Sequence, residues 1–428
     1  MNLLFKIDSE DTFNCTDCEK IIDFSKSNSF SYTFWELNER FHTWYETTAL
    51  DLLYLSLAVF ATDRLCLRSG ASDAWQRNFK LYLPVLNKTL FEANKELLQE
   101  MVSFLTGDYW EFHFRERELS SQEIGHKNRR IRKKDTVKEY DRVSMFSGGL
   151  DSFIGAIDIL ESANDKTTLF VSHYGGGKGT KEYQDYLKSK LIENYQLDER
   201  DFCQFYAKVV GGVEDTTRSR SFMFFAHAVA LASALGKPVE LIIPENGLIS
   251  LNIPLTLSRI GSSSTRTTHP YYIKKFQQLI DNLGLKITFS NPYQFKTKGE
   301  MLLECKNQDF MKKHFNTTMS CSHPDIGRMR GEKEARHCGY CLPCVVRQAA
   351  ILHAGLVDTS SYRDKFFKAG PNEKMILNSY LLGLGKFNPA KAFMTIQMNG
   401  IIDKDIEQYT DLYIRGMKEL KNYLDTIA

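Results

Sequence analysis

The segment Ser147-Gly-Gly-Leu-Asp-Ser152 has the residue types of a loop that binds phosphate. It follows a short strand-like run at 142–146, and an apolar helical pattern begins at 153. Free N–H groups at a helix N-terminus attract anions, and two glycines let the backbone close around one. Asp151 would repel a bare phosphate, so it indicates a bound Mg²⁺ or a helix cap. The loop lacks the Gly-Lys-Ser/Thr ending of the Walker motif, which argues against γ-phosphate transfer.

Four cysteines have the spacing of a metal site. Cys321, Cys338, Cys341 and Cys344 form C-x16-C-x2-C-x2-C. Four thiolates at such spacing suit tetrahedral Zn²⁺. Because sulfur fills every position, no place remains for a reacting water, and we expect a structural zinc. An iron–sulfur cluster and a chance grouping of thiols are the alternatives.

The role of the other cysteines is less clearly indicated by their spacing. The chain has nine cysteines, an odd number, and its N-terminus lacks the pattern of a secretory signal, so we expect a cytoplasmic protein with reduced thiols. Cys15 and Cys18 form an isolated CxxC pair, which only His42 and Cys66 could complete to four ligands. A second zinc site and a surface pair or redox-sensitive turn both remain possible for it.

The elements that must position these residues follow an alternating order. Short β-branched or aromatic runs alternate with helical stretches beyond residue 140, as in a parallel sheet covered by helices on both faces. We expect five strands, at 142–146, 167–174, 202–210, 239–245 and 286–292. Ligands bind such sheets at the carboxyl ends of the strands, so the loops that begin near 147, 174, 211 and 245 are the candidates.

The loop and the helices around it resemble a known family. Ser147–Ser152 is similar to the pyrophosphatase loop (PP-loop) of the ATP pyrophosphatases, which adenylate a substrate and release pyrophosphate. His173-Tyr-Gly175 falls where one branch carries Asp-Tyr-Gly, and 218–236 resembles that branch's Arg-Asn helix ending in Ala-Leu-Gly. With the four cysteines, residues 141–350 resemble 7-cyano-7-deazaguanine synthase of queuosine biosynthesis. Synthase-like proteins with added ends resemble a component of Qat-type anti-phage defence systems.

The resemblance implies an α/β fold of the HUP type, with a mostly parallel sheet, a zinc knuckle and helical additions at both ends. We expect a mostly helical, partner-docking N-terminal extension at 1–125, a basic linker at 126–140, the PP-loop ATP pyrophosphatase domain at 141–310, a zinc-binding segment at 311–355 and a helical C-terminal extension at 356–428.

The same resemblance and the residue types give a candidate site. Asp151, Ser147 and Ser152 are the candidate catalytic residues. Those expected to hold the nucleotide are Ser147, Gly148, Gly149, Leu150, Asp151, Ser152, His173, Tyr174, Gly175 and Arg220. Those expected to hold the second substrate are Arg218, Glu245, Asn246, Arg266, Thr267, His269 and Arg347, the last of which could instead stabilise the cysteine turn.

The sequence departs from the family in two loops. His173 stands in place of the family's Asp and is followed by glycines within 175–179, and 261–270 lacks the family's Asp-containing segment. These departures affect the base specificity more than the ATP chemistry. The carboxylate and amide of Glu245-Asn246 could recognise the edge of a purine-like base, or the pair could simply form the turn that ends a strand.

The expected reaction uses ATP and Mg²⁺ beside the structural Zn²⁺. A 7-deazaguanine carboxylate attacks the α-phosphate, pyrophosphate leaves, and an amine then displaces AMP from the acyl-adenylate. A partner protein's N-terminus is the favoured amine, since the added N-terminal region exceeds what a small synthase needs. Ammonia, giving the nitrile, is the alternative. A non-catalytic nucleotide-binding scaffold, and tRNA sulfuration or lysidine formation, are further hypotheses.

Composition limits the partners. The 428 residues carry 55 basic and 53 acidic side chains, a formal charge of +2 that gives no overall attraction to nucleic acid or membrane. The longest uncharged apolar run, 52–62, is too short to span a bilayer. Residues 126–135 hold six basic side chains, typical of a solvated linker or, less often, a phosphate contact. Neither a membrane nor a nucleic acid is therefore expected as a partner.

Overall fold

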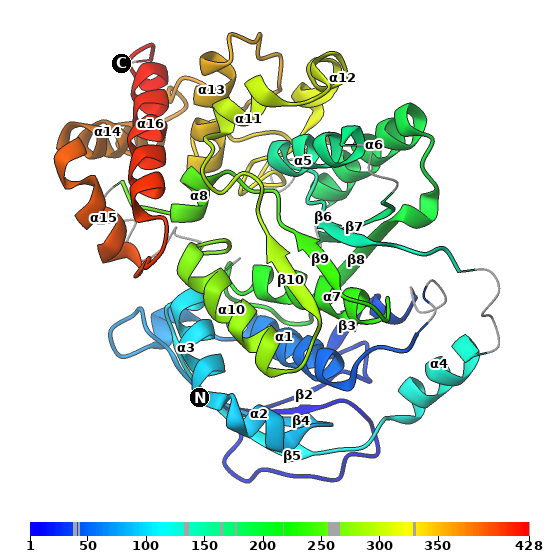
Figure 1. The fold of residues 1–428 in the computed structure, drawn as a ribbon. Helices are drawn as coiled ribbons and strands as arrows, with labels where there is room; N and C mark the ends of the chain where they lie inside the picture. Colours follow the sequence, from blue (N-terminus) through cyan, green and yellow to red (C-terminus); the bar gives the residue numbers. More distant parts are fainter. Residues whose placement is uncertain are drawn as a thin grey trace.

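The computed structural model of the chain contains two sheets (Figure 1). It describes residues 1–36, 41, 43–131, 137–162, 166–175, 178–216, 218–255, 266–327 and 331–427. The first sheet has the order β2-β1-β4-β5 and the second β10-β9-β6-β7-β8-β3.

The first sheet lies in the N-terminal region, where we expected mostly helices. Its strands, all parallel, are β1 (Asn2–Lys6), β2 (Lys20–Asp23), β4 (Asn78–Val85) and β5 (Tyr109–Glu116). The expectation of a mostly helical region is therefore wrong. Residues 83–105 have the apolar spacing of a helix, but they cover the end of β4, the short helix α2 (Lys88–Ala93) and α3 (Lys95–Thr106). Buried strands and helices give similar apolar runs, which periodicity alone does not separate.

The second sheet contains the five expected strands and one addition. Its strands β6 (Arg142–Met145), β7 (Thr168–Tyr174), β8 (Phe202–Val209), β9 (Val239–Ile242) and β10 (Ile287–Ser290) are parallel. β3 (Phe30–Tyr32) from the N-terminal region joins the free side of β8 antiparallel. The sheet thus has six strands rather than five. Local sequence does not show that a three-residue strand pairs with a strand far along the chain.

Alternate side chains of the second sheet pack into two different cores. Leu169 and Val171 face the core that holds α1 (Thr47–Leu65), α7 (Arg220–Ser233) and α10 (Pro270–Asn282). Phe170, between them, faces the core with α5 (Leu150–Glu161) and α6 (Lys178–Tyr195). Helix α1 is buried along almost its whole length and packs on α7, in the same core as both sheets. This packing fixes the N-terminal region against the second sheet.

A buried charge network joins the same regions. Both Asp63 at the end of α1 and Asp108 before β5 pair with Arg77, at 2.5 and 2.6 Å. Asp108 also pairs with Arg68 at 2.8 Å, and Asp63 accepts a hydrogen bond from Ser219 at the start of α7. These carboxylates are fully enclosed in protein, so each depends on its arginines for compensation.

Replacing Asp108 by Ala is expected to lower the free energy of unfolding by about 3–5 kcal/mol, because it leaves buried guanidinium groups unpaired. Urea unfolding followed by circular dichroism measures it. Asp215→Ala is the matched control, since Asp215 is 91% exposed in its ion pair with Arg64. A loss below about 1 kcal/mol for Asp108→Ala would mean that the network contributes little.

Two further segments complete the chain. Helix α4 (Ser121–Ile131) occupies the start of the stretch expected as a linker at 126–140, and 132–136 lie outside the described residues. The C-terminal part forms α14 (Pro371–Lys386), α15 (Ala392–Asn399) and α16 (Ile406–Leu424), which pack on α8 (Gly247–Leu251) and α13 (Leu342–His353). Within the described residues, none of the helices has the length and apolar character of a membrane span.

Candidate nucleotide site and metal centre

The loop 147–152 connects β6 directly to α5, as expected. Gly148 has a φ of +80°, a conformation open mainly to glycine. The Ser147 hydroxyl accepts the Gly149 N–H at 3.3 Å and donates to the Ser152 hydroxyl at 3.1 Å, while Ser152 donates to the Gly149 carbonyl at 3.0 Å. These bonds hold the loop in shape at the N-terminus of α5, where an anion would bind.

Two distant segments support the loop from outside. The Gln184 side-chain amide on α6 donates to the Ser147 and His173 carbonyls, at 3.0 Å each. The Met319 N–H donates to the Gly148 carbonyl at 2.9 Å. Neither residue was singled out from sequence, since Gln184 is an ordinary helix residue and Met319 acts through its backbone.

Substituting Gly148 by Ala should strain this loop. A Cβ there would lie 2.8 Å from Gln184 Cγ, with the backbone in the left-handed region. We expect a loss of about 1–3 kcal/mol in stability, read from thermal melts, together with weaker ATP binding. Gly149→Ala is the control for strain, since its φ is −81° and the nearest atom to its Cβ is 3.3 Å away. Equal losses in both variants would contradict the role given to the Gly148 backbone.

Asp151 lies at the centre of a polar cluster at the carboxyl ends of β6 and β9. One carboxylate oxygen is 2.5 Å from Lys298 Nζ, in the first turn of α11 (Lys298–Glu304). The other accepts the Asn246 side-chain amide at 2.7 Å and the Asn246 N–H at 3.2 Å. Asp151 and Lys298 are both buried, so Lys298 provides charge compensation within the site. Lys298 was missed from sequence, although it directly follows a capping residue, Thr297, after the last strand.

Glu245 completes the cluster, and its pKa is shifted in the opposite direction from that of Asp151. Burial raises the pKa of Glu245 well above its usual range, and the neighbouring Asp151 charge raises it further. Burial acts the same way on Asp151, but Lys298 and the hydrogen bonds to Glu245 and Asn246 outweigh it and lower the pKa of Asp151. A proton on Glu245 is thus favoured beside an ionised Asp151. Two neighbouring carboxyl groups are the oxygen donors that Mg²⁺ prefers, so these residues would fit the expected metal if its charge displaced the proton on Glu245.

A second polar group lies at the ends of β7 and β8. His173 is buried, and burial together with the Arg220 charge holds the pKa of its imidazole well below 6.5, so it is neutral at pH 7. Arg220 begins α7 and has no hydrogen bond or ion pair with any described residue. Burial lowers its pKa from the usual 12.5. An uncompensated guanidinium at a helix N-terminus is suited to an anion such as phosphate.

The remaining candidates for the nucleotide lie beside these groups. Tyr174 ends β7 and Gly175 follows it, and both are partly exposed, whereas Leu150 is buried in the core with α5 and α6. Tyr174 packs against Tyr206 with ring centroids 5.5 Å apart. Residues 176–177 of the glycine run lie outside the described residues.

The four cysteine sulfurs come together as the spacing predicts. Their Sγ atoms all lie within 4.8 Å of one another, with Cys321–Cys341 at 4.0 Å and Cys338–Cys344 at 3.9 Å. Tetrahedral Zn²⁺ with bonds of 2.3 Å places its sulfurs about 3.8 Å apart. The Cys338 N–H points at Cys321 Sγ, 3.2 Å away. The donor set and its geometry fit zinc, which would link the segment after α12 (Gln308–His314) to the start of α13.

This centre connects to the phosphate loop. His337, next to Cys338, bonds through Nε2 to the Thr318 carbonyl at 3.1 Å, and the following residue, Met319, donates to Gly148. Arg347 is fully enclosed and donates to the Thr318 hydroxyl and the Phe315 carbonyl, at 2.5 and 2.8 Å. These are contacts of a residue that holds the turn, the second of the two roles considered for Arg347, and the structure does not bring it to the phosphate loop.

Residues 262–355 match the family described as Queuosine biosynthesis protein QueC. The matched region begins before α10 and includes Lys298 and all four cysteines, and the loop 147–152 precedes it. This match supports a QueC-like PP-loop domain in the chain. No curated protein matches the chain. The match supports ATP-dependent chemistry related to 7-deazaguanine, with ATP and Mg²⁺ as the QueC-type cofactors and a structural four-cysteine centre compatible with zinc.

The other residues expected to hold the substrate of the QueC-like domain lie in two places. Arg266 and His269 pack against Phe104 of α3, and His269 caps α10 by accepting the Tyr271 N–H at 3.2 Å. Thr267 is partly exposed between them. Residues 261–265 of this loop lie outside the described residues.

Arg218 belongs instead to the charge network described above. Its guanidinium donates to the Thr106 carbonyl at 2.8 Å and lies 4.7 Å from the Trp75 ring centroid. Burial, reinforced by the Arg68 charge, lowers its pKa to about 10. Among the described residues, none of the phosphate-loop side chains contacts it.

The CxxC pair near the N-terminus forms a disulfide in the structure. Cys15 and Cys18 are joined, with Cα atoms 5.4 Å apart, in the loop between β1 and β2. The Cys18 N–H donates to the Cys15 carbonyl, and this tight turn brings the two sulfurs together. The bond uses both thiols, which differs from the reduced state expected, and Cys66 is buried elsewhere.

Proposed function

We propose that the protein activates the carboxylate of a 7-deazaguanine acid with ATP and transfers the acyl group to an amine, the N-terminus of a partner polypeptide, within an anti-phage defence system. The carboxylate attacks the α-phosphate of ATP, the bond to the β-phosphate oxygen breaks, and pyrophosphate leaves. The amine nitrogen then forms the amide, AMP leaves with the bonding electrons, and the amine gives up a proton.

The observation that carries this proposal is the set of cationic and donor groups at one edge of the second sheet. The loop 147–152 and the start of α5 supply backbone N–H groups for the pyrophosphate. Arg220 offers a guanidinium that has no hydrogen bond or ion pair with a described residue, and Lys298 brings a positive charge to Asp151. Asp151 and Glu245 would hold Mg²⁺, which neutralises the charge of the phosphates when bound. Positioning and charge neutralisation are sufficient for such a transfer, since the substrate provides the nucleophile.

The polypeptide acceptor is supported by the size of the N-terminal region. That region contributes a sheet of its own and the edge strand β3, and it packs on α7 and α10 next to the site. Ammonia needs no docking surface, whereas a polypeptide does. A secondary amide on a peptide nitrogen has no route to a neutral nitrile, so the reaction ends at the conjugated protein.

The test is to incubate the protein with ATP, Mg²⁺ and 7-carboxy-7-deazaguanine and to separate the nucleotides. We expect AMP and pyrophosphate, and ADP as the product would overturn the adenylation. Intact-mass analysis of a partner encoded beside the protein and co-expressed with it tests the acceptor. Absence of an added deazaguanine mass, despite AMP release, would overturn the polypeptide acceptor.

A second candidate is the synthase reaction with ammonia, which the match to the QueC family favours. It predicts that ammonium salts accelerate AMP release and that the product is the free nitrile. The nitrile, identified by its mass in the small-molecule fraction, separates this reaction from the conjugation.

A further inference from the structure

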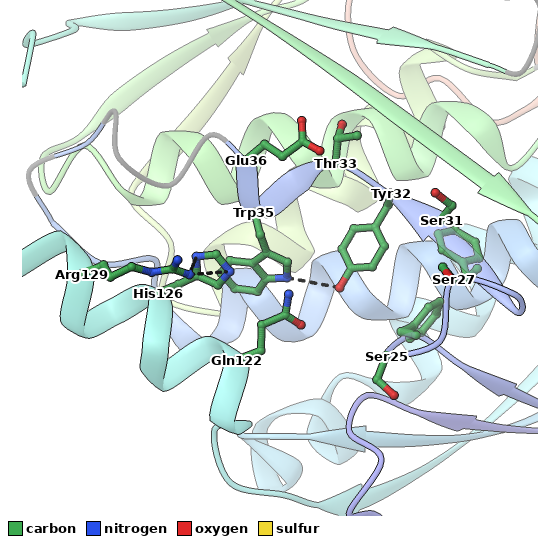
Figure 2. Close-up of a pocket in the computed structure, with 12 residues that line it drawn as sticks. Ser25, Ser27, Ser31, Tyr32, Thr33, Trp35, Glu36, Gln122, His126 and Arg129 are labelled. Carbon is green, nitrogen blue, oxygen red and sulfur yellow. Dashed lines mark hydrogen bonds between the residues drawn. The ribbon is translucent and has the colours of Figure 1, made fainter.

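A groove of about 510 Å³ lies between the edge strand β3 and helix α4, outside the phosphate-loop site. Figure 2 shows Tyr32 and Trp35 on one side and Gln122, His126 and Arg129 of α4 on the other. We propose that this groove binds an extended, acidic polypeptide segment of a partner protein, which adds to β3 as a further strand.

The backbone of β3 has an open side. β3 ends the six-stranded order, and among the described strands it pairs with β8. The Val210 N–H donates to the Ser29 carbonyl and the Thr33 N–H to the Tyr206 carbonyl, so the odd-numbered residues of this stretch turn their backbone groups toward β8. Those of Phe30 and Tyr32 therefore turn away from β8, and both residues line the groove. The Phe30 N–H is used by the Lys26 carbonyl, while the Tyr32 N–H and carbonyl have no backbone partner among the described residues.

Such an edge recognises one class of ligand. An extended peptide satisfies outward N–H and carbonyl groups by β-strand addition, and neighbouring side chains then select its sequence. Because β3 is short, its backbone hydrogen bonds contribute only part of the binding free energy of a peptide. The side chains of the groove walls must contribute the remainder.

The aromatic wall favours a peptide over a nucleic acid. The Trp35 ring is stacked on His126, with centroids 4.9 Å apart and an interplanar angle of 14°, and on Trp44, at 5.9 Å and 16°. Trp35 Nε1 donates to the Tyr32 hydroxyl at 3.2 Å. Trp35 is only 8% exposed, so its indole leaves little surface for a base to stack on, the main contact in single-strand binding.

The basic side chains on the α4 side of the groove set the preference for acidic residues. Arg129 is exposed at the rim and its guanidinium bonds to the His126 ring at 2.9 Å. Burial and the Arg129 charge lower the pKa of His126, so this ring is neutral at pH 7. Lys127 is exposed on the same helix, and Glu36 is the one acid among the described lining residues. The basic run 126–134, which the adenylation chemistry does not use, therefore begins at this groove.

The inference deepens the proposed function and rests on it only for the partner's role, as the polypeptide that is modified. Binding itself is measurable without catalysis. A docking groove on the N-terminal region would hold a partner by an internal segment while its N-terminus reaches the site.

The probe is a fluorescein-labelled short peptide of alternating glutamate and valine, followed by fluorescence anisotropy with the full-length protein. We expect saturable binding that weakens about tenfold when alternate backbone nitrogens are methylated, because methylation removes the N–H groups needed for strand addition. A peptide with lysine in place of glutamate should bind at least about tenfold more weakly. Equal binding of the methylated peptide, or no binding of the acidic one, would overturn the proposal.

Two variants test the groove directly. Arg129→Glu reverses the rim charge, and Gln122→Trp fills the space beside β3, and each should weaken the peptide about tenfold with an unchanged circular dichroism spectrum. Lys313→Glu, at an exposed position on α12, is the charge-matched control and should bind like the wild type. If oligo-dT binds the groove more tightly than the acidic peptide and loses affinity in both variants, the site is one for nucleic acid and the proposal is wrong.

Activity separates the two proposals. AMP release from ATP and the deazaguanine acid, measured without any acceptor, should be unchanged in Arg129→Glu. Peptide binding without AMP release would contradict the proposed reaction but not the peptide-binding role of the groove. AMP release without peptide binding would contradict only the peptide-binding role.

Discussion

Replacing Asp151 by asparagine is expected to lower the rate of AMP release by about a thousandfold or more. The substitution keeps the size of the side chain and removes the charge that pairs with Lys298 and that would hold Mg²⁺ beside the phosphates. Lys298 is then left as an uncompensated buried cation, which disturbs the same site a second time. The measurement is the initial rate of AMP formation at saturating ATP.

The control for Asp151→Asn is Glu161→Gln, which removes an exposed carboxylate from the other end of the same helix, α5. We expect that variant to retain wild-type AMP release. An Asp151→Asn protein that is folded and keeps more than about a tenth of the rate would contradict the catalytic role of the carboxylate.

Replacing Cys338 by serine is expected to empty the four-cysteine centre and to lower the free energy of unfolding by about 4 kcal/mol or more. Cys338 is buried between Cys321 and Cys344, and the next contact, through His337 and Thr318, leads to Met319 and the phosphate loop. Zinc content by mass spectrometry of the metal and the thermal midpoint of unfolding measure the direct effect. Weaker ATP binding should accompany it, because the Met319 N–H loses its fixed position beneath Gly148.

Cys305→Ser provides the matched control, since Cys305 is equally buried and lies outside the four-cysteine cluster. We expect it to retain zinc and to cost only about 1 kcal/mol. A Cys338→Ser protein with unchanged zinc content would show that these sulfurs do not hold the metal. Loss of zinc with unchanged ATP affinity would instead show that the metal centre does not support the phosphate loop.

Features that depend on neighbouring residues could be predicted from the sequence. The loop 147–152 needs only a strand before it and a helix after it, and the structure places it between β6 and α5. The cysteine centre draws three of its four ligands from one short segment, so their spacing already fixes most of its geometry.

Features that depend on distant pairing were missed. Lys298 reaches Asp151 only because α11 packs beside α5, and Gln184 supports the loop only because α6 lies next to it. The sequence of the N-terminal region predicts helices where the structure has a sheet, because the buried strands show apolar runs without a clear period. Arg218, adjacent in sequence to the helix that carries Arg220, points its guanidinium into the charge network because Thr106 and Trp75 lie there.

The sequence by itself determined the two local chemical units, the glycine-containing phosphate loop and the four-thiolate cluster, since the loop and three of the four cysteines each lie within a short contiguous stretch. Only the tertiary structure decided which charges compensate Asp151, which backbone closes the loop from outside, and that a strand from the N-terminal region forms the sheet edge. Those contacts join residues far apart along the chain, and the burial that brings them together is a property of the whole core.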